Sequence, residues 1–316
     1  MNRLERDPRL AARVLRRFEV AYAEGASVDE DRPAFVRAAS GIAWVGDELA
    51  IVQDDASFIA IGRPGELFRS IALPRGPGGR RRFEVALGNK YDKLDLETCV
   101  ARGERLLAFG SGSLPVREQI ASLSMSDGRA VMIDAAPFYA ELRSAPDFAG
   151  GQLNVEGAAI VGDVLRLFQR SNGRHGGHPA SVDVGLGAFL SWLDGTGPVP
   201  ALENARTYDL GEVRGVRFGF TDACEFGDAV VFVASAEASP NAVDDGELLG
   251  SLLGVFDDSS GRWAPLCDER GGTSNMKAEG IAIHHQHADR AWVVIDPDDP
   301  NQPAELCEVG LEGPWL

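Results

Sequence analysis

The sequence predicts an all-β fold, a β-propeller of four-stranded antiparallel blades. A segment that reads as two short apolar strands joined by a turn recurs five times, and the spacing of the copies leaves room for two more strands after each. We count five repeats and expect five or six blades. The segments are SGIAWVGDELAIVQDD from Ser40, ETCVARGERLLAFGSGS from Glu97, EGAAIVGDVLRLFQRSNG from Glu156, TDACEFGDAVVFVASAE from Thr221 and EGIAIHHQHADRAWVVIDPDD from Glu279.

The turn within each segment is the clearest local signal. In the first four copies a glycine followed by an acid stands at the same place, and glycine accepts the positive φ of a tight hairpin turn at little cost. The fifth copy has a longer turn, His284–Asp289, between flanks that still read as strands. The four glycine–acid pairs are Gly46-Asp47, Gly103-Glu104, Gly162-Asp163 and Gly227-Asp228.

The segments that follow each hairpin supply the outer strands. The copies start at 40, 97, 156, 221 and 279, and are separated by 57, 59, 65 and 58 residues. Alternating and β-branched patterns predict outer strands at 58–61 and 67–73 in the first unit, and at 119–125 and 130–133 in the second. Helical periodicity is confined to the N-terminus and Pro137–Arg143, so a parallel α/β sheet, which needs a helix between strands, is excluded.

The last unit reaches only about three strands by Val309. We expect a strand within Arg13–Tyr22 to complete it, so that the N-terminal segment 1–35 closes the ring and residues 1–316 form a single domain. A sixth blade could lie in 173–215 or 1–39.

The composition excludes several classes of function. With 31 basic and 48 acidic residues the net charge is −17, which disfavours nucleic acid and anionic membranes as partners. The sequence has no apolar run of about 18 residues, and we expect no secretory signal. The four cysteines form no CxxC pair, so we expect reduced thiols in a cytoplasmic protein. The oligomeric state stays open.

The repeat places polar residues at one end of the channel. The first strand of each blade lines the channel and the second runs back beside it, so the start of the first and the end of the second share one rim. The starts carry mainly acids, and the second strands close in polar groups. These closing groups are Asp54-Asp55, Ser111–Ser113, Arg170–Gly173, Ser235–Glu237 and Asp296–Asp298.

Carboxylates that converge on an axis repel one another unless a cation lies between them. Carboxylate and amide oxygens are the ligands of a hard cation, so we expect this rim to hold Ca²⁺ or another divalent cation. Basic residues of the same rim could neutralise the acids instead. The candidate metal ligands are Asp95, Glu97, Asn154, Glu156, Asp222 and Glu279.

Basic residues gathered on one rim of an acidic protein favour a small anionic ligand. The candidate substrate-binding residues are Arg37, Lys93, Arg170, Asn172, Arg217 and Lys277.

Two histidines lie on a glycine-rich loop at this rim, and we regard His175 and His178 as candidates for a catalytic general base. The alternative is that this loop is simply exposed and has no role in catalysis. His284, His285 and His287 occupy the turn of the last repeat at the far rim, and we interpret them as a solvated turn.

The repeated segments Glu156–Ala159 (EGAA) and Glu279–Ala282 (EGIA), with Phe168–Asn172 (FQRSN) closing a second strand, resemble the esterase-like phytase propellers of bacteria and their uncharacterised relatives. They are more distantly similar to the calcium-dependent lactonase propellers of the gluconolactonase type. The resemblance spans most of 36–309 and implies a propeller hydrolase with an axial metal, acting on a phosphate ester or a lactone. The residues that carry over are Glu156, Glu279, Arg170 and Asn172.

Two copies depart from this pattern, because Glu97-Thr98-Cys99 lacks the glycine and Thr221-Asp222 shifts the acid. No GxSxG elbow, phosphate-binding loop, dinucleotide fingerprint or HExxH occurs.

The leading hypothesis is therefore a metal-assisted hydrolase, in which Glu97, Glu156 and Glu279 hold a cation while Lys93, Arg170 and Lys277 hold the anion. The alternative is a non-catalytic propeller scaffold that binds a small ligand or a protein partner on its rim.

Overall fold

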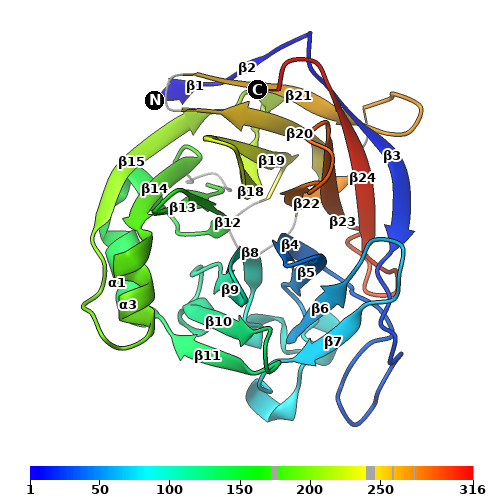
Figure 1. Ribbon diagram of the computed structural model, residues 1–316, viewed down its shortest axis with the longest axis vertical. Helices are drawn as coiled ribbons and strands as arrows, with labels where there is room; N and C mark the ends of the chain where they lie inside the picture. The colour runs from blue at the N-terminus through cyan, green and yellow to red at the C-terminus, as the bar shows by residue number, and fades with distance from the viewer. Residues whose placement is uncertain (172–176, 240–245, 258–259, 274, 316) are drawn as a thin grey trace.

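The computed structural model describes residues 1–171, 177–239, 246–257, 260–273 and 275–315. The structure is all-β and propeller-like: its sheets stand around a central axis, with one strand of each run of strands innermost (Figure 1). Five innermost strands, β4, β8, β12, β18 and β22, form a closed ring in which each contacts its two neighbours. None of the helices in the described ranges has the length and apolarity to span a bilayer.

Two sheets have four antiparallel strands each, in sequence order from the axis outward. The first contains β4 (Ala39–Val45), β5 (Glu48–Gln53), β6 (Phe58–Gly62) and β7 (Arg69–Ala72). The second contains β8 (Leu96–Arg102), β9 (Arg105–Gly110), β10 (Gln119–Ser124) and β11 (Ala130–Asp134).

The other two large sheets are extended by the N-terminal strands. A five-stranded sheet contains β12 (Val155–Val161), β13 (Val164–Gln169), β14 (Ala180–Gly185), β15 (Leu202–Asp209) and β1 (Asn2–Arg3). A nine-stranded sheet contains β18 (Gly219–Phe226), β19 (Ala229–Glu237), β20 (Leu248–Phe256), β21 (Gly261–Cys267), β22 (Lys277–Ile283), β23 (Arg290–Asp296), β24 (Glu305–Glu312), β3 (Ala11–Glu19) and β2 (Glu5–Arg6). A short pair, β16 (Glu212–Val213) and β17 (Val216–Arg217), stands apart.

The N-terminal strands make these sheets mixed rather than purely antiparallel, which corrects the prediction. β1 pairs in parallel with β15, β2 with β21, and β3 meets β21 in parallel over two residues, thereby joining two runs of strands. They cover backbone groups of outer strands that would otherwise be open edges. β3 itself runs antiparallel to β24 along its length. Its alternation, with Ala12 and Val14 buried and Arg13 exposed, is that of a strand, and its pairing with β24 is what we expected of a strand within Arg13–Tyr22 that completes the last unit.

The recurring hairpins have the turns that the sequence predicts. Gly46, Gly103, Gly162 and Gly227 have φ values of 62°, 59°, 59° and 62°. A side chain would be strained there, which explains glycine at this position of each repeat.

Short helices fill gaps at the outside of the ring. The predicted helical stretch forms α1 (Ala136–Ser144), whereas α2 (Pro146–Ala149) and α3 (Leu186–Leu193) were not predicted. α3 is apolar and packs Phe189 against Phe138 of α1, with ring centroids 5.2 Å apart. In the described part of 173–215, β14 and β15 complete the sheet of β12 and β13. The 3₁₀ helices are η1 (Pro77–Gly79), η2 (Val85–Leu87), η3 (Lys90–Asp92) and η4 (Pro115–Arg117).

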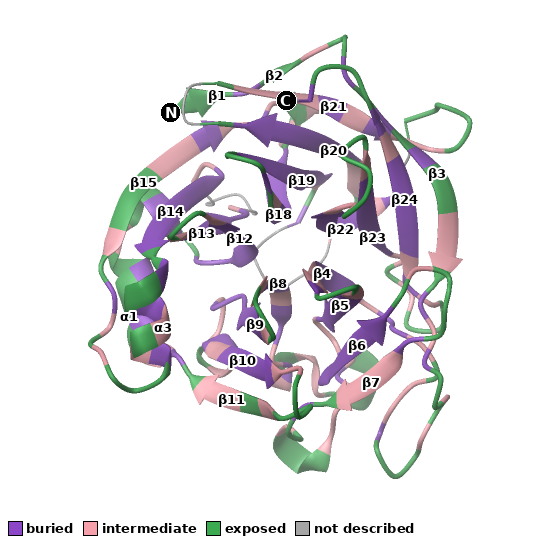
Figure 2. Cartoon of the chain, in the orientation of Figure 1, coloured by how far each residue is buried: buried purple, intermediate pink, exposed green. Residues whose placement is uncertain are grey.

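The apolar core lies between neighbouring sheets. Trp292 and Val294 of β23, for example, pack with Ile51 of β5 and Phe58 of β6 in one buried cluster. Inner strands are buried almost throughout, and exposure rises toward the outer strands β7, β11 and β15 (Figure 2). This packing fixes the inner strands and thus the two ends of the channel.

Candidate functional site

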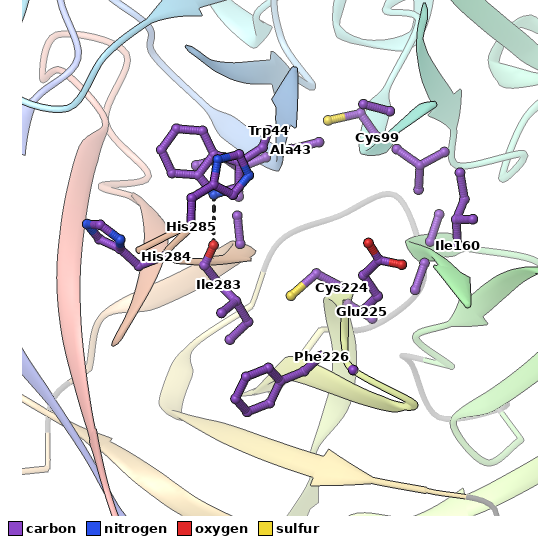
Figure 3. Close-up of a pocket in the computed structure, with 18 of the residues that line it drawn as sticks. Ala43, Trp44, Cys99, Ile160, Cys224, Glu225, Phe226, Ile283, His284 and His285 are labelled. Carbon is purple, nitrogen blue, oxygen red and sulfur yellow. Dashed lines mark hydrogen bonds between the residues drawn. The ribbon is translucent and has the colours of Figure 1, made fainter. Parts of the chain in front are cut away.

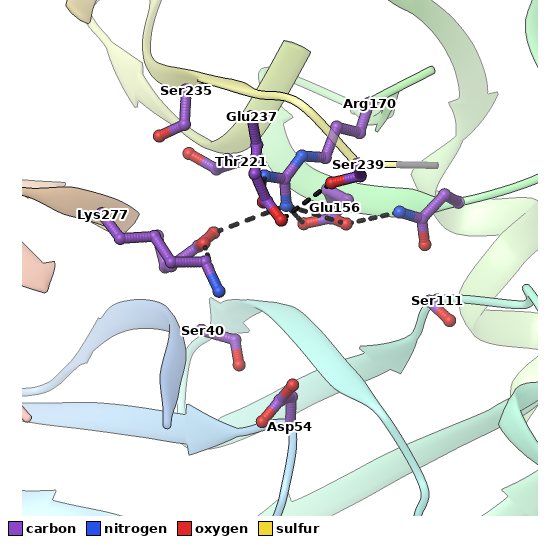
Figure 4. A network of polar contacts seen from close by, with 12 residues as sticks. Ser40, Asp54, Ser111, Glu156, Arg170, Thr221, Ser235, Glu237, Ser239 and Lys277 are labelled. Atoms are coloured by element: carbon purple, nitrogen blue, oxygen red, sulfur yellow. Dashed lines mark hydrogen bonds and ion pairs between the residues drawn. The ribbon is translucent and has the colours of Figure 1, made fainter. Parts of the chain in front are cut away.

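Each innermost strand carries a β-bulge at its first repeat residue. The pairing register shifts between Leu96 and Thr98, and at the matching place in the other four inner strands. A bulge inserts one extra residue and redirects its side chain. The residues bypassed by the register are Ser40 with Gly41, Glu97, Glu156, Thr221 and Glu279, and side chains from this set surround one end of the channel (Figure 4).

A buried lysine joins two acids on one side of this end. Lys93 Nζ lies 2.5 Å from Asp54 Oδ2 and 2.6 Å from Asp95 Oδ1. The fully buried guanidinium of Arg117, the last residue of η4, donates to Asp95 Oδ2 at 2.8 Å. Burial opposes the charge on Lys93, but Asp54 and Asp95 raise its pKa well above the usual value, so the ammonium stays charged.

Three carboxylates meet here. Asp54, Asp95 and Glu97 each offer an oxygen, and these oxygens lie within 4.8 Å of one another. Within the described ranges, Glu97 has no hydrogen bond and no ion pair, and Asp54 Oδ1 is buried without a hydrogen-bond partner. Burial, then the charges of Asp95 and Glu156, raise the pKa of Glu97 well above its usual value. The group offers the oxygen donor set that a hard cation prefers.

A buried arginine organises the opposite side of the same end. Arg170 lies 2.6 Å from Glu237, 3.3 Å from Glu156 and 4.0 Å from Glu279 (Figure 4). Asn154 Nδ2 donates to Glu156 Oε1 at 2.5 Å. Burial outweighs the attraction of Arg170 and raises the pKa of Glu156 to about 8. Glu156 therefore holds a proton at neutral pH.

Lys277 closes the ring of charges. Its ammonium lies 2.7 Å from Asp298 and 3.5 Å from both Glu279 and Asp296. Glu279 Oε1 is buried and accepts no hydrogen bond. Burial raises the pKa of Glu279, and that of Asp296 well above the usual value.

Acids outnumber bases at this end. Among the described residues of this cluster, eight carboxyl groups face four cations. The carboxyl groups whose pKa is raised are those that the cations do not neutralise fully. The acids are Asp54, Asp95, Glu97, Glu156, Glu237, Glu279, Asp296 and Asp298, and the bases are Lys93, Arg117, Arg170 and Lys277.

Asp222 does not belong to this cluster, contrary to the prediction. Its carboxylate accepts a hydrogen bond from Thr98 Oγ1 at 2.7 Å and one from the Ile281 amide at 3.0 Å. Thr221 occupies the bulge, so Asp222 falls one residue further along the strand, inside the ring. Its role is to join inner strands.

Other predicted site residues also lie outside the charged cluster. Arg37 is buried beside the cluster, where it pairs with Asp55 at 2.6 Å and with Glu84 at 3.0 Å. Arg217 is exposed and donates to the Gly177 carbonyl oxygen at 3.5 Å. His178 is half-buried, and Asn172 and His175 lie outside the described residues.

Several members of the cluster were not among the site residues predicted from the sequence. Asp54, Glu237, Asp296 and Asp298 close second strands, so the repeat predicted their rim position but not their contacts. Arg117 follows a proline in a turn between β9 and β10, and no repeat pattern marks it.

Comparisons with known proteins give a family and a fold. Residues 35–311 match the sequence model of a family described as "Family of unknown function (DUF6929)". The comparison with curated proteins gave no significant match. Glutaminyl cyclase from Myxococcus xanthus, a structure with a propeller-like fold, is 11% identical with a TM-score of 0.51, over 96% of this chain and 97% of that one.

Two further solved structures are similar over nearly their whole lengths. A putative exported protein from Bacteroides fragilis is 9% identical with a TM-score of 0.47, over 98% of this chain and 99% of that one. Virginiamycin B lyase from Staphylococcus aureus is 9% identical with a TM-score of 0.43, over 95% and 99%. At these identities only the likeness of fold to the cyclase bears on this chain.

Proposed function

The chain belongs to the DUF6929 family of unknown function, and because membership assigns no activity, we propose a function from the site itself: a metal-assisted hydrolase of a small anionic substrate. The observation that carries the proposal is the group formed by Asp54, Asp95 and Glu97, whose oxygens lie within 4.8 Å of one another. The substrate class, a phosphate ester or a lactone, rests on the sequence resemblance alone.

The donor set fits a divalent cation. Asp54 Oδ1 is a buried oxygen without a hydrogen-bond partner, and Glu97 has no cation of its own among the described residues. A dication beside them would supply the positive charge that the cluster lacks and would lower the raised pKa of Glu97. The residues that would hold it are Asp54, Asp95 and Glu97, with Ca²⁺ or another oxygen-seeking ion as occupant.

A bound dication polarises a phosphoryl or carbonyl oxygen and makes water a better nucleophile. The chain's own residues supply the rest. Arg170 and Lys277 present positive charge on the opposite side, where an anion would bind in competition with their carboxylate partners. Glu156, protonated at neutral pH, can donate its proton to a leaving group. The role of His178 as a base stays a prediction.

Calorimetric titration of EDTA-treated protein with Ca²⁺, Mg²⁺ and Mn²⁺ tests the metal step. We expect one ion per chain, and binding that Glu97→Gln weakens by about tenfold or more, as loss of a charged ligand predicts. Glu104→Gln is the matched control, because Glu104 is exposed in a hairpin turn. Absence of binding for all three ions, or equal binding by both variants, would refute the metal site.

Hydrolysis is tested separately, with phosphate esters and lactones in the presence of the ion that binds best. Metal binding without turnover of either class would refute the hydrolase and leave the metal site intact. One observation favours the alternative of a non-catalytic scaffold: Lys93, Arg170 and Lys277 are all already paired with carboxylates. In that case removal of the ion lowers the melting temperature and alters no activity.

A further inference from the structure

The opposite end of the channel contains a separate cavity. It has a volume of about 670 Å³ and is lined by all five innermost strands and by turn residues of the hairpins (Figure 3). Asp222 lies between this cavity and the charged cluster, as do Gly41 and Thr98, whose backbones pack closely together. The two ends of the channel are therefore distinct sites.

Small side chains form part of the cavity wall. Each inner strand contributes an alanine to the lining, namely Ala43, Ala101, Ala159, Ala223 and Ala282. The remaining wall is mixed: Val100, Ile160 and Phe226 are apolar, whereas Glu225, His284, His285 and Gln286 are polar. A volume of this size is typical of small-molecule sites.

An aromatic surface stands at one side. The Trp44 and His285 rings stack with centroids 4.0 Å apart and planes 28° apart. Trp44 Nε1 donates to the Ile283 carbonyl oxygen at 2.8 Å, which fixes the plane of the indole ring (Figure 3). A held indole ring can bind a flat apolar group, and its face attracts cations.

The lining has one carboxyl group, that of Glu225, and no lysine or arginine. Burial lowers the pKa of His284 and of His285, so both rings are neutral, and burial raises the pKa of the Cys99 and Cys224 thiols, which stay protonated. Glu225 points toward the cavity and forms no ion pair among the described residues (Figure 3). Burial raises the pKa of Glu225, and the charge of Arg102, which is not part of the lining, lowers it.

We propose that this cavity binds a small organic monocation, an amine with a flat aromatic body, with the ring beside Trp44 and the ammonium group at Glu225. The single carboxyl group of the lining favours a cation over an anion of the same shape.

Calorimetry with tryptamine, indole-3-acetate and indole tests the proposal, because the three share a ring and differ in charge. We expect tryptamine to bind more tightly than indole, and indole-3-acetate to bind most weakly. Glu225→Gln should weaken tryptamine binding by about tenfold and leave indole unchanged. Asp228→Asn is the control, since Asp228 is an exposed acid of the same hairpin outside the lining.

The proposal is overturned if tryptamine does not bind at millimolar concentration, if indole-3-acetate binds equally well, or if Glu225→Gln and Asp228→Asn have the same effect. Glu97→Gln, at the other end, should leave tryptamine binding unchanged. A loss with that variant would also overturn the assignment, because it would place the amine in the charged cluster.

Discussion

Thr98 Oγ1 donates a hydrogen bond of 2.7 Å to Asp222 Oδ1 and thereby joins β8 to β18 across the channel. These strands are not neighbours in the ring, since β12 stands between them and contacts both. Asp222 also accepts the Ile281 amide of β22 at 3.0 Å. One buried carboxylate thus accepts hydrogen bonds from two separate strands that face the channel. These strands form the inner edge of each sheet, where the ladder of backbone hydrogen bonds ends.

We predict that Asp222→Ala destabilises the fold by about 2–4 kcal/mol, because the buried donors lose their acceptor. Thr98→Val should cost about 1–2 kcal/mol through the same bond. Urea unfolding monitored by circular dichroism measures both. Thr207→Val on the outer strand β15 is the control and should lie within about 0.5 kcal/mol of the native protein. A loss as small for Asp222→Ala as for the control would contradict this role.

The close packing of inner strands gives a second prediction. A Cβ on Gly41 would lie 2.6 Å from Thr98 Cα and 3.0 Å from the Cys99 nitrogen, both backbone atoms that cannot rotate away. Gly41→Ala should therefore cost about 1–3 kcal/mol, as overpacking does. Gly185→Ala is the matched control, because nothing lies within 4 Å of its added Cβ. Chemical denaturation of the two variants gives the comparison, and equal midpoints would show that the ring adjusts freely.

The pKa of Glu156 predicts how stability depends on pH. The folded pKa, about 8, lies above the ordinary value of 4.5, so between pH 5 and 8 the folded state holds a proton that the unfolded state has lost. The free energy of unfolding should fall as pH rises through this window, by up to about 1.4 kcal/mol per pH unit for one proton. Glu97, Glu279 and Asp296, with raised pKa values, act in the same direction.

Urea titrations between pH 5 and pH 8 test this, with Glu156→Gln as the variant. We expect Glu156→Gln to flatten the profile and Glu104→Gln to leave it unchanged. If a dication binds the cluster, saturating Ca²⁺ should also flatten it, since the ion favours ionised carboxylates. A stability that rises from pH 5 to pH 8 in the metal-free protein would show that the carboxyl groups are ionised in the fold.

The repeat made much of this site predictable, and its irregularities limited the rest. Glu97 and Glu156 could be placed at one end because the hairpin glycines fix their register, and Glu279 because the flanks of its longer turn still read as the same two strands. Asp222 was misassigned because the bulge selects one residue, and in that repeat Thr221 takes the place of the glutamate. Arg117 could not be found at all, since a 3₁₀ turn that occurs in one repeat brings it under the cluster.

Arg117 provides the last prediction, because it is fully buried and donates at 2.8 Å to Asp95 Oδ2 and to Ser113 Oγ. Arg117→Met should cost about 3–5 kcal/mol, as it removes one of the two cations that neutralise Asp95 inside the protein. The double variant Asp95→Asn/Arg117→Met should recover part of that loss, because an uncharged amide needs no counterion. Exposed Arg129→Met is the control. Additive losses in the double variant would contradict an electrostatic role, and Arg117 would then act through packing of its side chain alone.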